Sequence, residues 1–80
     1  MPGSKGNGVV EEINKHCIVY KDDKILLLVC KLGDEFCISD INRTTTKCSS
    51  RLGFLLGELV DKKLSPENIA KIIEWALRSE

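Results

Sequence analysis

The sequence predicts an α+β fold, a three-stranded antiparallel meander followed by a two-helix hairpin packed on the sheet. Three short runs rich in β-branched and aromatic residues come first, separated by turn signals. Two longer segments with apolar residues at helical spacing follow. The 80 residues have room for one domain. Residues 1–8 hold three of the six glycines and are expected to be a disordered tail or a cloning remnant, which leaves 9–80 as the domain.

The expected strands lie close together, so tight turns must join them into a meander. The strands are expected at 16–20, 25–30 and 36–39, with turns at 21–24 and 32–35. Gly33-Asp34 suits a two-residue type II′ turn, which takes glycine first. Residues 9–13 are either a further strand or a short helical lead-in, and the sequence leaves both open.

The first expected helix follows a polar connection, 40–50, that is rich in Ser and Thr and is expected to end in N-caps. Its apolar positions recur at intervals of three and four: Leu52, Leu55, Leu56, Leu59 and Val60. Gly53 and Gly57 fall four apart on one stripe of this helix. Each costs about 1 kcal/mol relative to alanine, so we expect another element to pack closely against the stripe.

The second expected helix begins at Ser65-Pro66-Glu67, which supplies a cap, a proline for the first turn and an acid for the positive end of the dipole. Its apolar face then consists of Ile69, Ile72, Ile73, Ala76 and Leu77. Trp75 is expected to lie beside that face. This start signal is specific because three independent preferences coincide in three residues.

Three of the four cysteines are expected to share one face of the sheet. A turn at Gly33-Asp34 places Cys30 opposite Cys37, and a turn at Asp22-Asp23 places Cys17 diagonal to Cys30. Cys48 is expected near the start of the first helix. Buried core thiols are the favoured interpretation, because free cysteine is often buried. The alternatives are a zinc site made by Cys17, Cys30, Cys37 and Cys48, and a Cys30–Cys37 disulfide or redox pair.

Three cations precede the first helix at intervals of four residues: Arg43, Lys47 and Arg51. If this stretch is helical, all three share one face. Cations and hydroxyl groups at a helix N-terminus can hold a phosphate or a nucleic-acid backbone. The competing interpretation is an ordinary solvated surface, since no glycine-rich phosphate loop accompanies the cations.

Overall charge and hydropathy narrow the function classes. Twelve basic and twelve acidic residues give a net charge of zero, which argues against a general nucleic-acid or membrane-surface binder. No secretory signal is visible and no apolar run reaches membrane-span length, so we expect a cytoplasmic protein that does not enter membranes. Both faces of the expected sheet are apolar, and two helices cover only one of them. This pattern predicts a homodimer.

The residues from Val29 to Trp75 carry a family resemblance. The features are the strand ending Val29-Cys30-Lys31-Leu32-Gly33, the helix around Gly53-Phe54-Leu55 and the start signal at Ser65-Pro66-Glu67. Together they resemble the small C-terminal accessory domain of cobalamin-dependent ribonucleotide reductases, a group named for a Thr-Ser-Cys-Pro-Asp motif. That motif is absent here, and no functional residue is carried over. The resemblance implies a non-catalytic module with a strand followed by two helices.

The sequence shows no catalytic constellation: Cys48 could act as a nucleophile, but the single histidine, His16, is far from it in the sequence. The leading hypothesis is therefore a small non-catalytic interaction module without a cofactor, with a protein partner and a role accessory to nucleotide or nucleic-acid metabolism. The alternatives are a nucleic-acid-binding protein using Arg43, Lys47 and Arg51, and a small cysteine-based zinc or redox protein.

Overall fold

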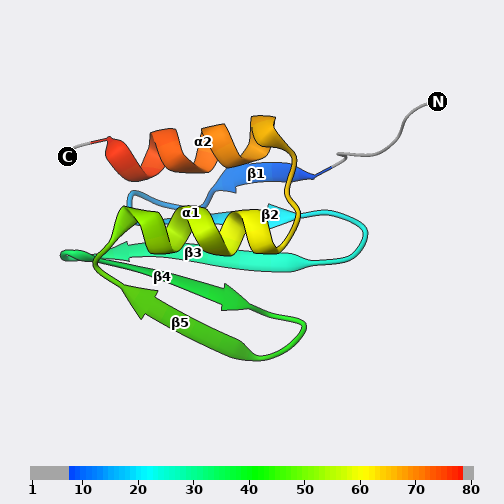
Figure 1. Cartoon of the computed structure of the whole chain (residues 1–80), viewed down its shortest axis with the longest axis horizontal. Helices are drawn as coiled ribbons and strands as arrows, with labels where there is room; N and C mark the ends of the chain where they lie inside the picture. Colours follow the sequence, from blue (N-terminus) through cyan, green and yellow to red (C-terminus); the bar gives the residue numbers. More distant parts are fainter. Residues whose placement is uncertain (1–7, 79–80) are drawn as a thin grey trace.

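A computed structural model describes residues 8–78, which form a five-stranded antiparallel sheet with strand order β1-β2-β3-β4-β5 and two helices (Figure 1). The strands are β1 (Val9–Glu12), β2 (Cys17–Lys21), β3 (Leu26–Leu32), β4 (Glu35–Asp40) and β5 (Thr45–Ser49). The helices are α1 (Leu52–Asp61) and α2 (Pro66–Leu77). The α+β class and the two-helix hairpin are confirmed. The prediction of three strands is wrong, because an edge strand is added on each side.

The two additional strands lack the apolar alternation that identifies a strand in a sequence. β5 reads Thr-Thr-Lys-Cys-Ser, and none of its residues is buried. It forms because β4 offers a free hydrogen-bonding edge, along which Phe36 pairs with Ser49 and Asp40 with Thr45. β1 likewise pairs along β2, from Val9 opposite Lys21 to Glu12 opposite Ile18. Backbone pairing therefore decides both edges.

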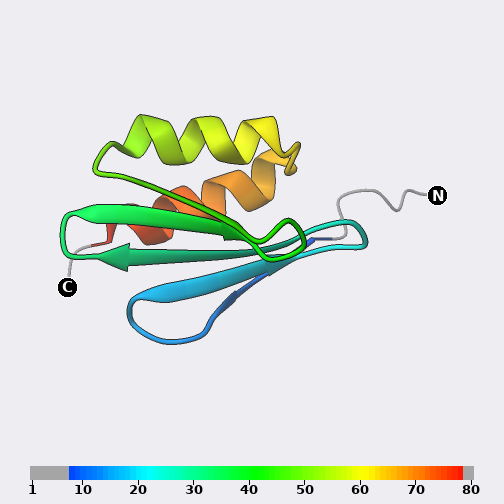
Figure 2. The ribbon, with the colours of Figure 1, turned by 90° about the horizontal axis from the view of Figure 1, so that it is seen from below.

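The helices lie together on one side of the sheet and leave its other face open within the described residues (Figure 2). α2 lies against β1, and α1 lies against β4 and β5. The core between sheet and helices contains Ile18, Tyr20, Leu27, Val29, Ile38, Leu55, Leu59, Leu64, Ile72, Trp75 and Ala76. The opposite side of each strand faces away from this core. We call that side the open face.

The register of the sheet partly follows the prediction. Cys30 lies opposite Cys37, and Gly33 has φ of 62°, as the first position of a II′ turn requires. The β2–β3 register is shifted by two residues, because the loop spans 22–25 rather than two residues. Asp22 stabilises this wider loop, since its Oδ1 accepts backbone N–H bonds from Lys24 (2.7 Å) and Ile25 (2.8 Å). An Asx-type turn thus replaces the expected tight turn.

Asp22 also joins the loop to the core. Its Oδ2 accepts a hydrogen bond from the hydroxyl of buried Tyr20 at 2.7 Å. Burial raises the pKa of the Asp22 carboxyl, but the hydrogen bonds from Tyr20 and the loop backbone and the charge of Lys24 outweigh burial, so the net pKa is lowered. Burial and the neighbouring Asp22 raise the pKa of Tyr20. The pair is therefore held as a neutral phenol donating to a carboxylate.

The starts of the two helices differ. Ser65 caps α2 by accepting from the Asn68 backbone N–H, with Pro66 in the first turn, as predicted. α1 begins after Arg51, whose side chain makes no capping bond, so the expected cap is wrong. The expected close packing at Gly53 and Gly57 is also wrong, since a Cβ added at either position would meet nothing within 4 Å.

At the C-terminal end of α2, the buried residue is not the one that the sequence predicted. Trp75 is buried in the core, whereas Leu77, assigned to the apolar face, is 65% exposed at the last turn. Lys31 projects from β3 toward this end. Its Nζ lies 5.6 Å from the Trp75 ring and donates to the carbonyl oxygens of Ala76 (3.2 Å) and Arg78 (2.8 Å). Lys31 thereby supplies a cation to the negative end of the helix dipole.

Gly8, which the sequence pattern assigned to the tail, is the first described residue and contacts the core. Residues 1–7 of the expected tail lie outside the described residues. The Gly8 carbonyl oxygen accepts from buried Asn68 at 3.3 Å, and a Cβ at Gly8 would overlap the Tyr20 ring. Gly8 therefore belongs to the packed structure. Neither helix among residues 8–78 has the length and apolar character needed to cross a membrane.

Candidate functional site: a row of four cysteines

The four cysteines form one continuous row across the open face, from β2 to β5. In the strand register Cys17 lies opposite Cys30, Cys30 opposite Cys37, and Cys37 opposite Cys48. The sequence placed the first three on one face, which is confirmed. Cys48 was expected near the helix start, and this is wrong because residues 45–49 form the edge strand β5.

The row is closed by two disulfides, Cys17–Cys30 and Cys37–Cys48. Their Cα–Cα distances are 4.1 Å and 4.0 Å. Hydrogen-bonded and non-hydrogen-bonded pairs alternate along such a row, and the non-hydrogen-bonded pairs are closer. The II′ turn makes Cys30 and Cys37 a hydrogen-bonded pair, so the disulfides occupy the two closer pairs.

This pairing corrects two interpretations of the cysteines. None of the four is free, so the favoured interpretation as core thiols is wrong. The disulfide expected between Cys30 and Cys37 is also wrong, because each of these residues is bonded to its other neighbour. The two-residue shift of the β2–β3 register explains the difference, since it brings Cys17 directly opposite Cys30 instead of diagonal to it.

A zinc ion held by all four cysteines does not suit this geometry. The ends of the row, Cys17 and Cys48, are three strand spacings apart, on the order of 14 Å. A tetrahedral Cys₄ site needs its sulfurs roughly 3.8 Å apart. A smaller group, Glu35, Cys37 and Cys48, has its potential ligand atoms within 4.8 Å of one another. Both of its sulfurs are in a disulfide, so neither is a thiolate that could bind metal.

The surroundings of the row are apolar on one side and polar at the β5 edge. Val19, Leu26 and Leu28 are half-buried on the same face. Ser39 and Thr46 follow toward the edge, with their hydroxyl oxygens 2.9 Å apart. Cys17, Cys30 and Cys37 are half-buried, whereas Cys48 is exposed. The exposed cysteine of the row is therefore the one on the edge strand of the sheet.

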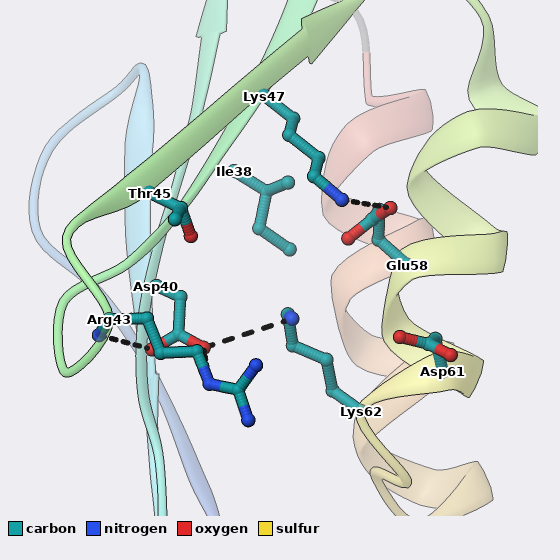
Figure 3. A pocket seen from close by; sticks show the side chains of 8 residues that line it. All are labelled: Ile38, Asp40, Arg43, Thr45, Lys47, Glu58, Asp61 and Lys62. Carbon is teal, nitrogen blue, oxygen red and sulfur yellow. Dashed lines mark hydrogen bonds and ion pairs between the residues drawn. The ribbon is translucent and has the colours of Figure 1, made fainter.

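A polar cleft of about 190 Å³ lies on the other side of the sheet, between β4, β5 and α1 (Figure 3). Its centre is the buried carboxylate of Asp40, 3.8 Å from Lys62 Nζ and 4.0 Å from Arg43 Nε. Lys47 Nζ lies 3.6 Å from Glu58. Cations and carboxylates alternate around this cleft, so it offers no unbalanced positive charge to an anion.

The three cations expected to share a helical face belong to three different elements. Arg43 lies in the β4–β5 turn, Lys47 in β5, and Arg51 immediately before α1. The helical premise is wrong because the segment pairs with β4. Lys47 points toward α1, where it pairs with Glu58 (Figure 3). The structure brings Arg43 and Lys47 to the same cleft, but it does not assemble all three into one basic surface.

Two features of the cysteine row were missed in the sequence: the strand that carries Cys48 and the proximity of Glu35. A signal for the first was present. Asp40 and Asn42 are turn residues, and a turn centred on Asn42 and Arg43 places Cys48 opposite Cys37. Glu35 comes near the row because it lies two residues before Cys37 on β4 and shares its face.

Comparison with protein-family models, curated proteins and solved structures finds no significant match to this chain. The function must therefore be inferred from the chemistry and the shape of its own surfaces.

Proposed function

We propose that this protein is a small non-catalytic binding module that self-associates through the open face of its sheet. The observation that carries the proposal is the composition of that face. β3 presents Leu26, Leu28, Cys30 and Leu32 in succession there. When one face of an antiparallel sheet is solvated, residues along each strand normally alternate between apolar side chains toward the core and polar side chains toward solvent. An apolar face of this kind is typical of a surface that is covered by another protein.

Charge placement supports a second copy of this chain as the occupant. The charged residues of the open face are Glu11, Lys21 and Glu35. Lys21 ends β2 and Glu35 begins β4, so they lie on opposite sides of β3 and at opposite ends of the face. A two-fold axis that lies in the interface, crosses β3 between Leu28 and Cys30 and runs perpendicular to the line from Lys21 to Glu35 places each Lys21 over the other copy's Glu35. Two reciprocal ion pairs would then flank an apolar centre, as an isologous interface requires.

The disulfides also bear on where the module works. Structural disulfides persist in oxidising compartments and in the intracellular proteins of hyperthermophiles, and they are rare in other cytosols. We propose that the protein works under oxidising conditions. A cytoplasmic location of structural disulfides would fit a hyperthermophile. The accessory role in nucleotide or nucleic-acid metabolism is supported by the family resemblance alone and stays a prediction.

Sedimentation equilibrium tests the self-association. We expect wild-type protein to be dimeric at high micromolar concentration and Leu28→Lys to be monomeric, because a lysine at the centre of the face would be buried without a partner. Leu56→Lys is the matched control, since Leu56 is 43% exposed on α1, on the other side of the molecule. It should remain dimeric, and circular dichroism should show that both variants are folded.

A charge exchange tests the two-fold geometry itself. Lys21→Glu and Glu35→Lys should each weaken the dimer by placing like charges together, and the double variant should restore it. A wild-type monomer at every concentration would overturn the proposal. A dimer whose stability is unchanged by both Leu28→Lys and the charge exchange would show that a different surface is used.

A further inference from the structure

We propose that the cysteine row is a thiol–disulfide exchange site, which accepts electrons from low-molecular-weight thiols at Cys48 and moves a disulfide to Cys30–Cys37. This activity goes beyond the binding role and does not depend on it. Two disulfides on adjacent strand pairs share a row in which each cysteine faces the next. A sulfur released from one disulfide therefore faces the other disulfide directly.

Entry occurs at Cys48 because it is the exposed residue of the row and lies on the edge strand. A small thiolate, of the glutathione or cysteine class, attacks Cys48 Sγ and forms a mixed disulfide with it. The Cys37–Cys48 bond breaks, and its electron pair leaves on Cys37 as a thiolate. Attack through a mixed disulfide is the ordinary route of exchange.

The second step crosses from β4 to β3. Cys37 and Cys30 are register partners of a hydrogen-bonded pair, for which the Cα–Cα distance is about 5.5 Å, within the usual disulfide range. Because Cys37, Cys30 and Cys17 follow one another along the row, the attacking and leaving sulfurs flank Cys30 on opposite sides. The Cys37 thiolate bonds to Cys30 Sγ, the Cys17–Cys30 bond breaks, and Cys17 leaves as a thiolate that takes a proton from water.

A second small thiol completes the balance. Its thiolate attacks the mixed disulfide, releases the oxidised small disulfide and leaves Cys48 as a thiolate, which is then protonated. Two small thiols are oxidised to one disulfide, and the protein gains two electrons and two protons. Its two disulfides have become one, Cys30–Cys37, flanked by the free thiols of Cys17 and Cys48.

Glu35 is placed to regulate the entry step. Its carboxylate, Cys37 Sγ and Cys48 Sγ all lie within 4.8 Å of one another. A negative charge at this distance disfavours both the approach of an anionic thiolate and the formation of the Cys37 thiolate. Glu35→Gln should therefore speed the opening of Cys37–Cys48 by glutathione several-fold. The acceleration should be smaller for an uncharged thiol such as 2-mercaptoethanol.

Disulfide mapping after limited reduction tests the proposal on the native chain. Lys and Arg residues lie between all neighbouring cysteines, so trypsin places each cysteine in a separate peptide. Native protein is treated with limiting glutathione, quenched with acid, alkylated and digested. We expect the single-disulfide product to contain the Cys30–Cys37 linked peptides, with Cys17 and Cys48 alkylated. A product that keeps Cys17–Cys30, with Cys37 and Cys48 alkylated, would overturn the proposal.

A variant isolates the second step from the first. Cys48→Ser leaves Cys37 free beside the Cys17–Cys30 disulfide, and we expect both Cys17–Cys30 and Cys30–Cys37 to form at mildly alkaline pH without any reductant. Finding Cys17–Cys30 alone in the folded variant would contradict the step. Cys37→Ser is the matched control, because it leaves Cys48 free without a neighbour on β4, and it should retain only Cys17–Cys30.

The measurements separate this activity from self-association. A dimer joined through the open face would reduce access to the row, so mapping is done at low protein concentration and on the Leu28→Lys variant. Exchange in that variant supports the site whatever the oligomeric state of the wild type. Absence of exchange in both proteins would refute the site and leave the dimer proposal standing.

Discussion

Removing either disulfide should cost nearly the same free energy of unfolding, because the loops they close are nearly equal. The perturbations are the paired variants Cys17→Ser/Cys30→Ser and Cys37→Ser/Cys48→Ser. The sequence separations are 13 and 11 residues. The chain-entropy relation then gives losses of about 2.9 and 2.8 kcal/mol at 25 °C.

The two losses should add, because the loops do not overlap along the chain. Their sum, about 5.7 kcal/mol, comes in addition to the 3–5 kcal/mol or so that a core of this size supplies without cross-links. We therefore expect each paired variant to be folded but weakened, and the four-serine variant to keep only the small stability of the core, with an unfolding midpoint far below that of the wild type.

Urea unfolding followed by fluorescence measures these losses, because Trp75 is the single tryptophan and is 4% exposed. The m-value should rise when a cross-link is removed, since the unfolded chain then exposes more surface. A loss below about 1 kcal/mol for either pair, or a four-serine variant as stable as the wild type, would refute the entropic reasoning.

Three further predictions follow from local contacts. Gly53→Ala and Gly57→Ala should each raise the free energy of unfolding by roughly 0.5–1 kcal/mol, because both sites are helical and open, and a lower melting temperature would contradict this. The Asp22 carboxylate bonded to Tyr20 has a lowered pKa, so its contribution to the free energy of unfolding is present above about pH 4 and is lost as the pH falls through the folded-state pKa. Asp22→Asn should therefore reduce the fall of the melting temperature with decreasing pH, measured in thermal melts across the acid range. Lys31→Met keeps the alkyl stem but removes two bonds to the end of α2 and should cost about 1–2 kcal/mol in urea unfolding, whereas an unchanged midpoint would exclude the cap.

Several parts of the cysteine row could be predicted from the sequence. The II′ turn at Gly33 determined the β3–β4 register, and with it the position of Cys30 opposite Cys37. The pairing of the four cysteines could not be predicted, because it depends on a two-residue difference in the β2–β3 loop. Asp22 decides that loop through its side-chain hydrogen bonds, and a sequence pattern does not distinguish this turn from a shorter one.

The sequence by itself determined the elements whose side chains carry the signal: both helices, the three central strands and the two apolar faces of the sheet. Hydrophobic periodicity and capping preferences are local, so they can be recognised before the chain is folded. Only the tertiary structure decided β1, β5, the disulfide pairing and the separation of Arg43, Lys47 and Arg51. The physical reason is that an edge strand forms by hydrogen bonding of its backbone to a strand already in place, and every residue type except proline can offer that bond.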